Sequence, residues 1–407
     1  MNKSHQSLIM ITTSALKGKE AQKNSYNPFS WYEDMRKNNP VSFNSQADMW
    51  NVFSYEDVKR VLEDKEYFSS VMPAKKSPFQ GSIIRMDPPK HTQIRSIVNR
   101  SFTPKVLKNW EPRIHQITTD LLARLSNRET FDIVGELFYP LPVIVIAEML
   151  GVSPKDMEKF KRWSDILVSS PTHDDPDYLT DFFHTRSQAE KEISDFFEEI
   201  IQTKREQSKK DSEDIISLLV QNEEEGKISG EDIAPFCKLL LVAGHETTTN
   251  LLGNALYSFI EHPDSYQQIK NDLSLIPNAI EEVLRYRSPV QQLLRRVNKE
   301  IHLKGKALQV DQVISAWIGS ANRDSDQFKD ADSFNIHRKP NSHLAFGQGI
   351  HFCLGAPLAR LEAKIVLTEL FNTYDEFSFL ENNRPIPIQN SNSVYGLVSF
   401  PLHAKKS

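Results

Sequence analysis

The chain contains 407 residues, of which 39% are hydrophobic and 25% are charged, and its formal net charge at pH 7 is −5. This balance is typical of a globular protein with a large core, and it excludes fibrous and intrinsically disordered chains. It also argues against general nucleic-acid binding, which usually requires a basic domain.

The cysteine count and the N-terminal segment bear on location. Two cysteines form at most one disulfide and cannot build a four-cysteine metal site, so we expect a reducing compartment. The apolar run "LIMI" at residues 8–11 is far shorter than the roughly 20 apolar residues of a spanning helix, and it lacks the features of a signal peptide. We expect a cytoplasmic protein without a membrane anchor.

Short alternating stretches predict strands, and apolar residues at three- and four-residue spacing predict helices. The strands are predicted at "VSFN" from Val41, "MWNVF" from Met49 and "VISAWI" from Val313, with the first two at hairpin distance. The predicted helices cover residues 105–125, 141–150, 188–209, 232–261 and 356–371. Because no flexible linker or internal repeat interrupts the chain, residues 1–407 are predicted to form a single domain, mainly α with a small β portion.

Residues 90–110 form a basic stretch without any acidic residue. Its cations are Lys90, Arg95, Arg100, Lys105 and Lys108. Such a stretch predicts an anionic partner, although a solvated helix face would give the same pattern. The chain has neither of the glycine-rich loops that cradle nucleotide phosphates, so any redox cofactor must be held in another way.

The stretch "FGQGIHFCLG", residues 346–355, surrounds Cys353 with glycines. Gly347 and Gly349 can adopt positive φ, which lets the chain turn tightly and approach a flat ligand. The predicted helix begins directly after Cys353, and the positive end of its dipole should lower the pKa of the thiol and favour a metal-bound sulfur. A buried free cysteine in a glycine-containing turn is the simpler alternative.

Two further side chains of this stretch suit a large planar ligand. Phe346 can shield the sulfur side of a macrocycle from water, and His351 can direct a donor to its edge. A single sulfur ligand, with no second protein ligand nearby, suits a metal whose other positions are filled by a macrocycle. These residues therefore predict haem with Cys353 as the axial ligand.

The pattern Phe346-x-x-Gly349-x-His351-x-Cys353-x-Gly355 closely resembles the haem-binding loop of the cytochrome P450 family. Residues 321–362 as a whole resemble the soluble, Bacillus-type bacterial branch. The stretches "MDPPKHTQIR", "LLVAGHETTTN" and "EEVLRYRSPV" resemble other signatures of the family, in the expected order. The resemblance implies the P450 fold, with haem b between the long central helix and the helix that follows the cysteine.

Residues 232–261 would form a helix about 45 Å long that crosses the domain. The Thr247 hydroxyl is predicted to bond to the carbonyl of Ala243 and to open a local bulge with room for dioxygen. The resemblance implies that Glu246 and Thr247 are the catalytic residues: Thr247 steadies the activated oxygen and Glu246 feeds its proton relay. It also implies haem contacts at Ala243, Gly347 and Gly355.

Haem propionates require cationic donors. His91 and Arg95 lie four residues apart, on one face of a helix, and match the propionate-binding pair of the family. Arg295 matches another propionate arginine, although Arg296 leaves the register open, and His351 is the fourth candidate.

The resemblance also implies a scaffold behind the cysteine loop. Glu282 and Arg285 would form an ion pair that is buried in the family and joined by an arginine matched here by Arg338. Breaking a buried network of this kind strands an unpaired charge, so mutation should abolish haem incorporation.

By resemblance, the chain is a haem-thiolate monooxygenase that hydroxylates a lipophilic small molecule such as a steroid, terpenoid or fatty acid. The substrate segments of the family correspond to residues 71–84, 163–173, 239–244, 289–294 and 393–398, which are largely apolar. No reductase is fused, so electrons should come from a separate ferredoxin or flavodoxin with an NAD(P)H-dependent reductase. We expect a monomer whose Arg100, Lys105 and Lys108 steer an acidic redox partner.

Two alternatives remain open from the sequence. A peroxide-driven peroxygenase would share the fold, but members of that kind carry Arg-Pro in place of the acid–alcohol pair. A non-catalytic haem-binding protein would need neither that pair nor a basic docking surface.

Overall fold

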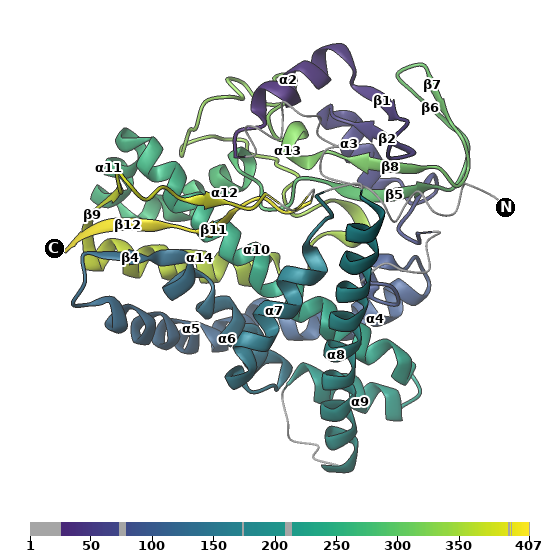
Figure 1. Cartoon of the computed structure of the whole chain (residues 1–407), viewed down its shortest axis with the longest axis horizontal. Coiled ribbons are helices and arrows are strands. Elements are labelled where there is room, and N and C mark those ends of the chain that lie inside the picture. Colours follow the sequence, from purple (N-terminus) through teal and green to yellow (C-terminus); the bar gives the residue numbers. More distant parts are fainter. Residues whose placement is uncertain are drawn as a thin grey trace.

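The computed structural model describes residues 26–72, 79–172, 175–207, 214–389, 391 and 393–406 (Figure 1). Its α-helices are α2 (Phe29–Asn38), α3 (Tyr55–Glu63), α4 (Lys90–Val98), α5 (Pro104–Leu125), α6 (Pro140–Leu150), α7 (Met157–Val168), α8 (Pro176–Gln207), α9 (Ile215–Glu224), α10 (Ile233–Glu261), α11 (Pro263–Asn271), α12 (Ile276–Tyr286), α13 (Ile318–Ala321) and α14 (Ala356–Thr373). Its strands are β1 (Val41–Asn44), β2 (Met49–Val52), β3 (Phe68–Ser69), β4 (Thr130–Asp132), β5 (Leu293–Val297), β6 (Ile301–Leu303), β7 (Lys306–Leu308), β8 (Val313–Ala316), β9 (Tyr374–Phe379), β10 (Ile386–Pro387), β11 (Leu397–Ser399) and β12 (Pro401–Lys406).

The predicted mainly helical fold is confirmed, with one large correction to an element boundary. Helix α8 begins at Pro176, twelve residues before the predicted start at 188. Proline suits the first turn of a helix, and Leu179 and Phe182 continue its apolar spacing further back than expected. The predicted residues 208 and 209 lie outside the described ranges.

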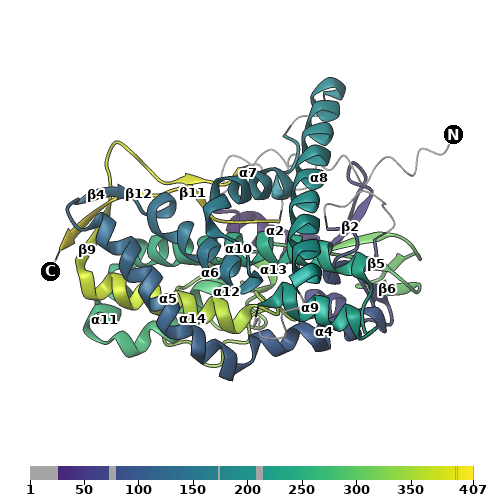
Figure 2. The same ribbon diagram turned by 90° about the horizontal axis from the view of Figure 1, so that it is seen from below.

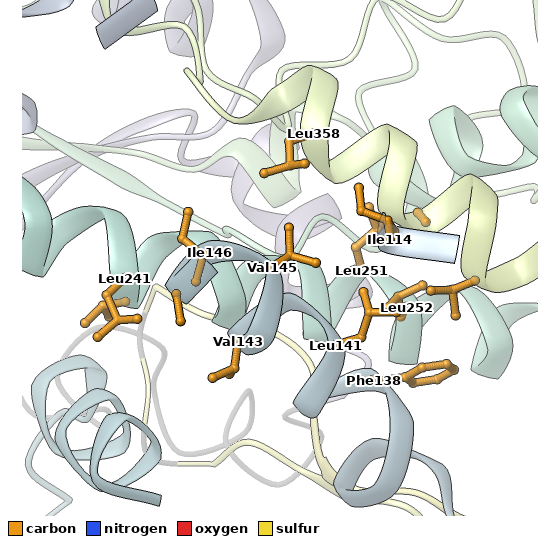
Figure 3. Close-up of a cluster of buried hydrophobic side chains, with 14 of the residues drawn as sticks. Ile114, Phe138, Leu141, Val143, Val145, Ile146, Leu241, Leu251, Leu252 and Leu358 are labelled. Carbon is orange, nitrogen blue, oxygen red and sulfur yellow. The ribbon is translucent and has the colours of Figure 1, made fainter. Parts of the chain in front are cut away.

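Helix α10 forms the centre of the core. It is apolar nearly all round, which is typical of a helix buried on every side. Figure 3 shows Leu241, Leu251 and Leu252 of α10 among side chains of α6, α5 and α14. Helices α5 and α14 run side by side along one side of this core, as Figure 2 shows. The cysteine loop therefore leads into a helix that packs on the same core as α10.

The larger sheet has the strand order β1-β2-β8-β5-β3 and lies to one side of the helical core (Figure 1). The predicted hairpin is confirmed by the antiparallel pairing of β1 with β2. Strand β8 lies between β2, to which it is parallel, and β5, to which it is antiparallel. This order places Arg295 on β5, between β8 and β3.

A second sheet, with the order β4-β12-β9, joins the C-terminal strand to the end of α14. Within the described ranges, no helix is both long enough and apolar enough to span a bilayer.

Candidate functional site

The cysteine loop folds back on itself through backbone hydrogen bonds. The amide of Cys353 donates to the carbonyl of Phe346 (2.8 Å), and the amide of Gly347 donates to that of Leu344 (2.8 Å). Gly347 and Gly349 have φ values of 72° and 71°, so both take the left-handed conformation predicted from the sequence.

Gly349 also allows a close approach between two segments. A Cβ atom at this position would lie 3.1 Å from the Cα of Glu63 and 3.2 Å from the carbonyl oxygen of Leu62, at the end of α3. Both are backbone atoms and cannot rotate away. Because Gly349 has no side chain, the loop can pack directly against the backbone at the end of α3.

The electrostatics of Cys353 correct one prediction. The thiol is partly exposed, just before α14. Burial raises its pKa, and this outweighs the amides of Gly355 and Ala356 and the nearby Arg95, all of which act to lower it. The helix N-terminus thus acts in the predicted direction, but in the polypeptide alone burial determines the net shift of the pKa. A neutral thiol loses little by desolvation, whereas a thiolate needs a stronger positive partner, such as a metal ion.

Phe346 is held from outside by a charged network. The Arg360 guanidinium lies 4.5 Å from the centre of the Phe346 ring, within the range of a cation–π contact. Arg360 donates twice to Glu281 (2.7 and 2.8 Å), which also pairs with His343. Although burial raises the pKa of Glu281, the hydrogen bonds from Arg360 and His343 outweigh it and bring the pKa to about 2. This fixed carboxylate orients the cation that covers the ring.

The middle of α10 carries an unusual opening. Ala243 is exposed within a helix that is otherwise almost wholly buried, and Thr247, one turn later, is only partly buried. The Thr247 hydroxyl donates to the carbonyl of Ala243 (2.7 Å), as predicted. Side chains on this face of α10 thus border open space rather than packed protein.

The predicted bulge, however, is absent: α10 is a regular α-helix from Ile233 to Glu261. The Thr247 hydroxyl adds a second bond to the carbonyl oxygen, which has two lone pairs, so the backbone ladder survives. The glycine at position 244 is explained by packing, because a Cβ there would lie 2.9 Å from Ile146 Cγ1 on α6. The glycine lets two helices pack closely and does not mark a helix defect.

Glu246 lines a cavity of ≈ 450 Å³ between α10 and α7. Burial raises the pKa of the Glu246 carboxyl to about 8; nearby Asp165 raises it further, whereas Lys161 lowers it. Tyr139 and His245 share the wall, with their rings edge to face at 5.5 Å. The acid is therefore protonated at neutral pH, in a cavity that it shares with the charged groups Glu158, Lys161 and Asp165 of α7.

The neighbours of Glu246 include Asp165 and Lys161, which no sequence pattern predicted. They lie four residues apart on α7, where their spacing predicts only an exposed ion pair, and they do form one (2.8 Å). The packing of α7 against α10 brings them to the cavity, and no local pattern encodes that packing.

His91, Arg95, Arg295 and His351 converge, as predicted. The rings of His91 and His351 lie 4.3 Å apart. Arg95 donates to the carbonyl of Phe352 (2.8 Å), and burial, followed by the Arg295 charge, lowers the pKa of His351 to about 3. Four donors from α4, β5 and the cysteine loop thus gather at one place.

The two neighbouring arginines between which the sequence left the register open have different surroundings. Arg295 is 6% exposed and donates to the carbonyl of Leu294. Arg296 instead pairs with Asp311 (2.6 Å) and donates to the carbonyl of Val71. Only Arg295 faces the cluster around His351.

Comparison with known proteins decides the family. The family model described as cytochrome P450 matches residues 6–405. The chain is 50% identical over 385 residues to the putative cytochrome P450 YjiB of Bacillus subtilis, an alignment that covers 95% of this chain and 96% of that protein. The chain belongs to the cytochrome P450 family.

Solved structures agree with this assignment. The structure of CYP109E1 from Bacillus megaterium in complex with testosterone matches with a TM-score of 0.90 and 46% identity, and covers 94% of this chain and 99% of that one. CYP109B1 from Bacillus subtilis matches with a TM-score of 0.83 and 48% identity, and covers 93% and 99%. This P450 is therefore a monooxygenase whose cofactor is haem b, and its predicted fold is confirmed.

The residues of this P450 fit haem. Both ring nitrogens of His91 are buried without a hydrogen-bond partner among the described residues, as is Nε2 of His351. Buried donors of this kind require acceptors, and haem propionates would supply them. Gly355 has φ of −83°, and no atom lies within 4 Å of a Cβ placed there, so the protein itself does not require the glycine. The free space beside Gly355 and the exposed side chain of Ala243 are both what a bound haem would require.

The scaffold of this P450 has the predicted geometry. Glu282 and Arg285 are fully buried and joined by two bonds of 2.8 Å, and Arg338 donates to both oxygens of Glu282. Arg285 also donates to the carbonyl of Asn322, whose side chain accepts from the amide of Leu344. A continuous chain of hydrogen bonds thus runs from the ion pair to the start of the cysteine loop.

Proposed function

We propose that this P450 hydroxylates a lipophilic small molecule, with Cys353 as the axial ligand of the haem iron. The observations that carry the proposal are the exposed Ala243 and the partly buried Thr247 in an otherwise buried α10, and the buried ring nitrogens of His91 and His351 that have no partner among the described residues. When bound, haem would supply the activation of dioxygen, which a cysteine thiolate ligand would favour. The chain supplies the ligand sulfur, the propionate donors and the protons.

Glu246 and Thr247 are proposed as the catalytic pair. Glu246 holds a proton at neutral pH and borders a cavity that reaches charged groups on α7, which suits a group that takes protons from water and passes them inward. The Thr247 hydroxyl is turned toward the backbone of its own helix and lies at the open face. This arrangement favours a monooxygenase over a peroxide-driven enzyme, which needs no proton supply of this kind.

The favoured substrate class is a steroid. CYP109E1, at 46% identity, has been crystallised with testosterone, and another of its structures contains corticosterone. Of the proposed substrate segments, the part at 73–78 and residue 173 lie outside the described residues. In the segment 239–244, residues 239–242 are buried and apolar, and Ala243 is exposed; an apolar segment of this kind suits a steroid.

Electrons are proposed to arrive at the cysteine-loop face, from a ferredoxin or flavodoxin with its NAD(P)H-dependent reductase. Arg100, Lys105 and Lys108 are all exposed next to α4, which bears Arg95. Phe352, which directly precedes Cys353, is 40% exposed and would give the partner an apolar contact.

Both described cysteines are free thiols, which supports the expected reducing compartment.

Charge reversal tests the docking surface. Replacing Arg100, Lys105 and Lys108 by glutamate is expected to slow reduction by an acidic ferredoxin and to remove its salt dependence, because steering depends on opposite charges. Stopped-flow reduction at salt concentrations from about 0.05 to 0.5 M measures the salt dependence, because exposed charges become screened over this range. An unchanged salt dependence would contradict this docking surface.

Thr247→Ala tests the proposed chemistry. With a surrogate ferredoxin, its reductase and testosterone, the wild type should form hydroxylated product, and the variant should form at least about tenfold less product per NADPH consumed, because proton delivery is misdirected. Thr248→Ala is the matched control, since Thr248 makes the same bond to the fourth preceding carbonyl but is 3% exposed. Equal coupling in wild type and Thr247→Ala, or equal loss in both variants, would contradict the assigned role.

A further inference from the structure

One arginine near the propionate donors has no role in the function proposed above. Arg85 ends the short 3-10 helix Ile83–Arg85, just before the segment that leads into α4. Its Nε is buried and has no hydrogen-bond partner among the described residues. An unpaired buried N–H of a guanidinium is costly, so this group needs an acceptor that the described residues do not supply.

Arg85 lies beside the site already described. Burial lowers the pKa of Arg295 most, and the charge of Arg85 lowers it next; together they bring this pKa to about 10. Met86, the next residue, accepts a hydrogen bond from His351 through its carbonyl. Two buried guanidiniums close enough to affect each other repel, unless an anion compensates them.

The nearby carboxylate does not pair with them. Asp87 accepts hydrogen bonds from the Ser69 hydroxyl (2.5 Å) and the Ser70 amide (3.0 Å). It therefore orients the chain before α4, and its hydrogen-bonding capacity is directed to these two serines. Its charge counts in the local balance, but it does not satisfy Arg85.

The charge count at this edge depends on Arg85. Among the described residues, the charged groups that act on Arg295 and the two histidines are Arg85, Arg95 and Arg295 themselves and the carboxylate of Asp87, which leaves two positive charges. Two propionates would neutralise them. Without Arg85, one positive charge would face two propionates, and one carboxylate would be buried without compensation.

We propose that Arg85 is a further haem-positioning residue, which binds a propionate together with Arg295. The proposal rests on the function proposed above, because it requires haem in the space between α10 and the cysteine loop. A substrate carboxylate could provide the same anion. That source would act only when substrate is present, so the test uses the substrate-free holoenzyme.

The test is the rate at which ferric, substrate-free holoenzyme transfers its haem to excess apomyoglobin. Arg85→Gln is expected to lose haem about tenfold faster than wild type, because one charge-assisted hydrogen bond to a propionate is lost. Its midpoint reduction potential should become more negative, since removal of a positive charge favours the ferric state. Arg296→Gln is the matched control, because Arg296 neighbours Arg295 but pairs with Asp311.

Wild-type haem loss and potential in Arg85→Gln, or the same changes in Arg296→Gln, would overturn the proposal. If Arg85→Gln takes up no haem, Arg85→Lys decides: a potential near that of wild type supports the charge role, and failure to bind haem overturns it. The carbonyl spectrum of the reduced wild type separates the two claims. Absence of a thiolate-type band there overturns the proposed function, whereas a normal band with unchanged haem loss overturns only the role of Arg85.

Discussion

Replacing Arg285 by lysine is expected to lower the free energy of unfolding by about 3–5 kcal/mol and to abolish haem incorporation. Arg285 uses all five of its N–H groups, two toward Glu282 and three toward the carbonyls of Asn322, Ala331 and Ser333. Lysine offers three donors without the planar fork, so it leaves buried acceptors unsatisfied. Denaturation followed by circular dichroism, together with haem content per protein, measures both effects.

The loss of haem is expected because the network reaches the cysteine loop. Asn322 accepts from Arg285 through its carbonyl and from the amide of Leu344 through its side chain, and the Leu344 carbonyl accepts from the amide of Gly347. Movement of Arg285 is therefore transmitted to the turn that carries Cys353.

The matched control is Arg113→Lys. Arg113 forms the same two-bonded pair with Glu148, at 2.9 and 2.6 Å, but its side chain is 46% exposed. Water can replace the lost bonds, so this change should cost less than about 1 kcal/mol and leave haem content unchanged. Similar stability losses in both variants, or a haem-loaded Arg285→Lys of wild-type stability, would contradict the scaffold role.

Glu246→Gln is expected to reduce product formation about 100-fold, because the amide cannot pass on a proton. The wild-type rate should fall as the pH rises through about 8, where the Glu246 carboxyl loses its proton, and the variant should show no such fall. Rates measured from about pH 6 to pH 9 span that pKa by about 1–2 units on either side, and they reveal the difference between the two proteins. Glu158→Gln is the control, since Glu158 lines the same cavity at its exposed side.

The same carboxyl links stability to pH. Its folded pKa of about 8 lies above the ordinary value of 4.5 for a glutamate, so the folded state keeps a proton that the unfolded state releases. The free energy of unfolding of the wild type should therefore fall, relative to Glu246→Gln, as the pH rises from 4.5 to about 8. An equal pH dependence in both proteins, with unchanged product formation in the variant, would contradict the assignment.

Local signals predicted the site best where the backbone itself demands a residue. The glycines at 347 and 349 take positive φ, and the helix after Cys353 begins at Ala356 as predicted. The convergence of His91, Arg295 and His351 could not be read from local spacing, because they come from three distant segments. The resemblance to a known family supplied that arrangement.

Other features could not be predicted because they depend on packing. Arg85 lies between the predicted substrate segment at 71–84 and the family signature that begins "MDPPKH". Nothing in the local sequence distinguishes it from a surface arginine. Asp165 has the spacing of an exposed ion pair and reaches Glu246 only because α7 packs next to α10. The raised pKa of Cys353 likewise reflects burial by neighbouring segments, which outweighs the helix N-terminus that the sequence shows.

The most direct test of the central claim is the carbonyl difference spectrum of the reduced protein, for wild type and Cys353→Ser. Carbon monoxide bound opposite a cysteine thiolate gives a strongly red-shifted Soret band, because the sulfur donates electron density to the iron. The wild type is expected to show this band and Cys353→Ser to lack it, even where the variant retains haem. Absence of the band from the wild type, or its persistence in Cys353→Ser, would contradict the assignment of Cys353 as the axial ligand.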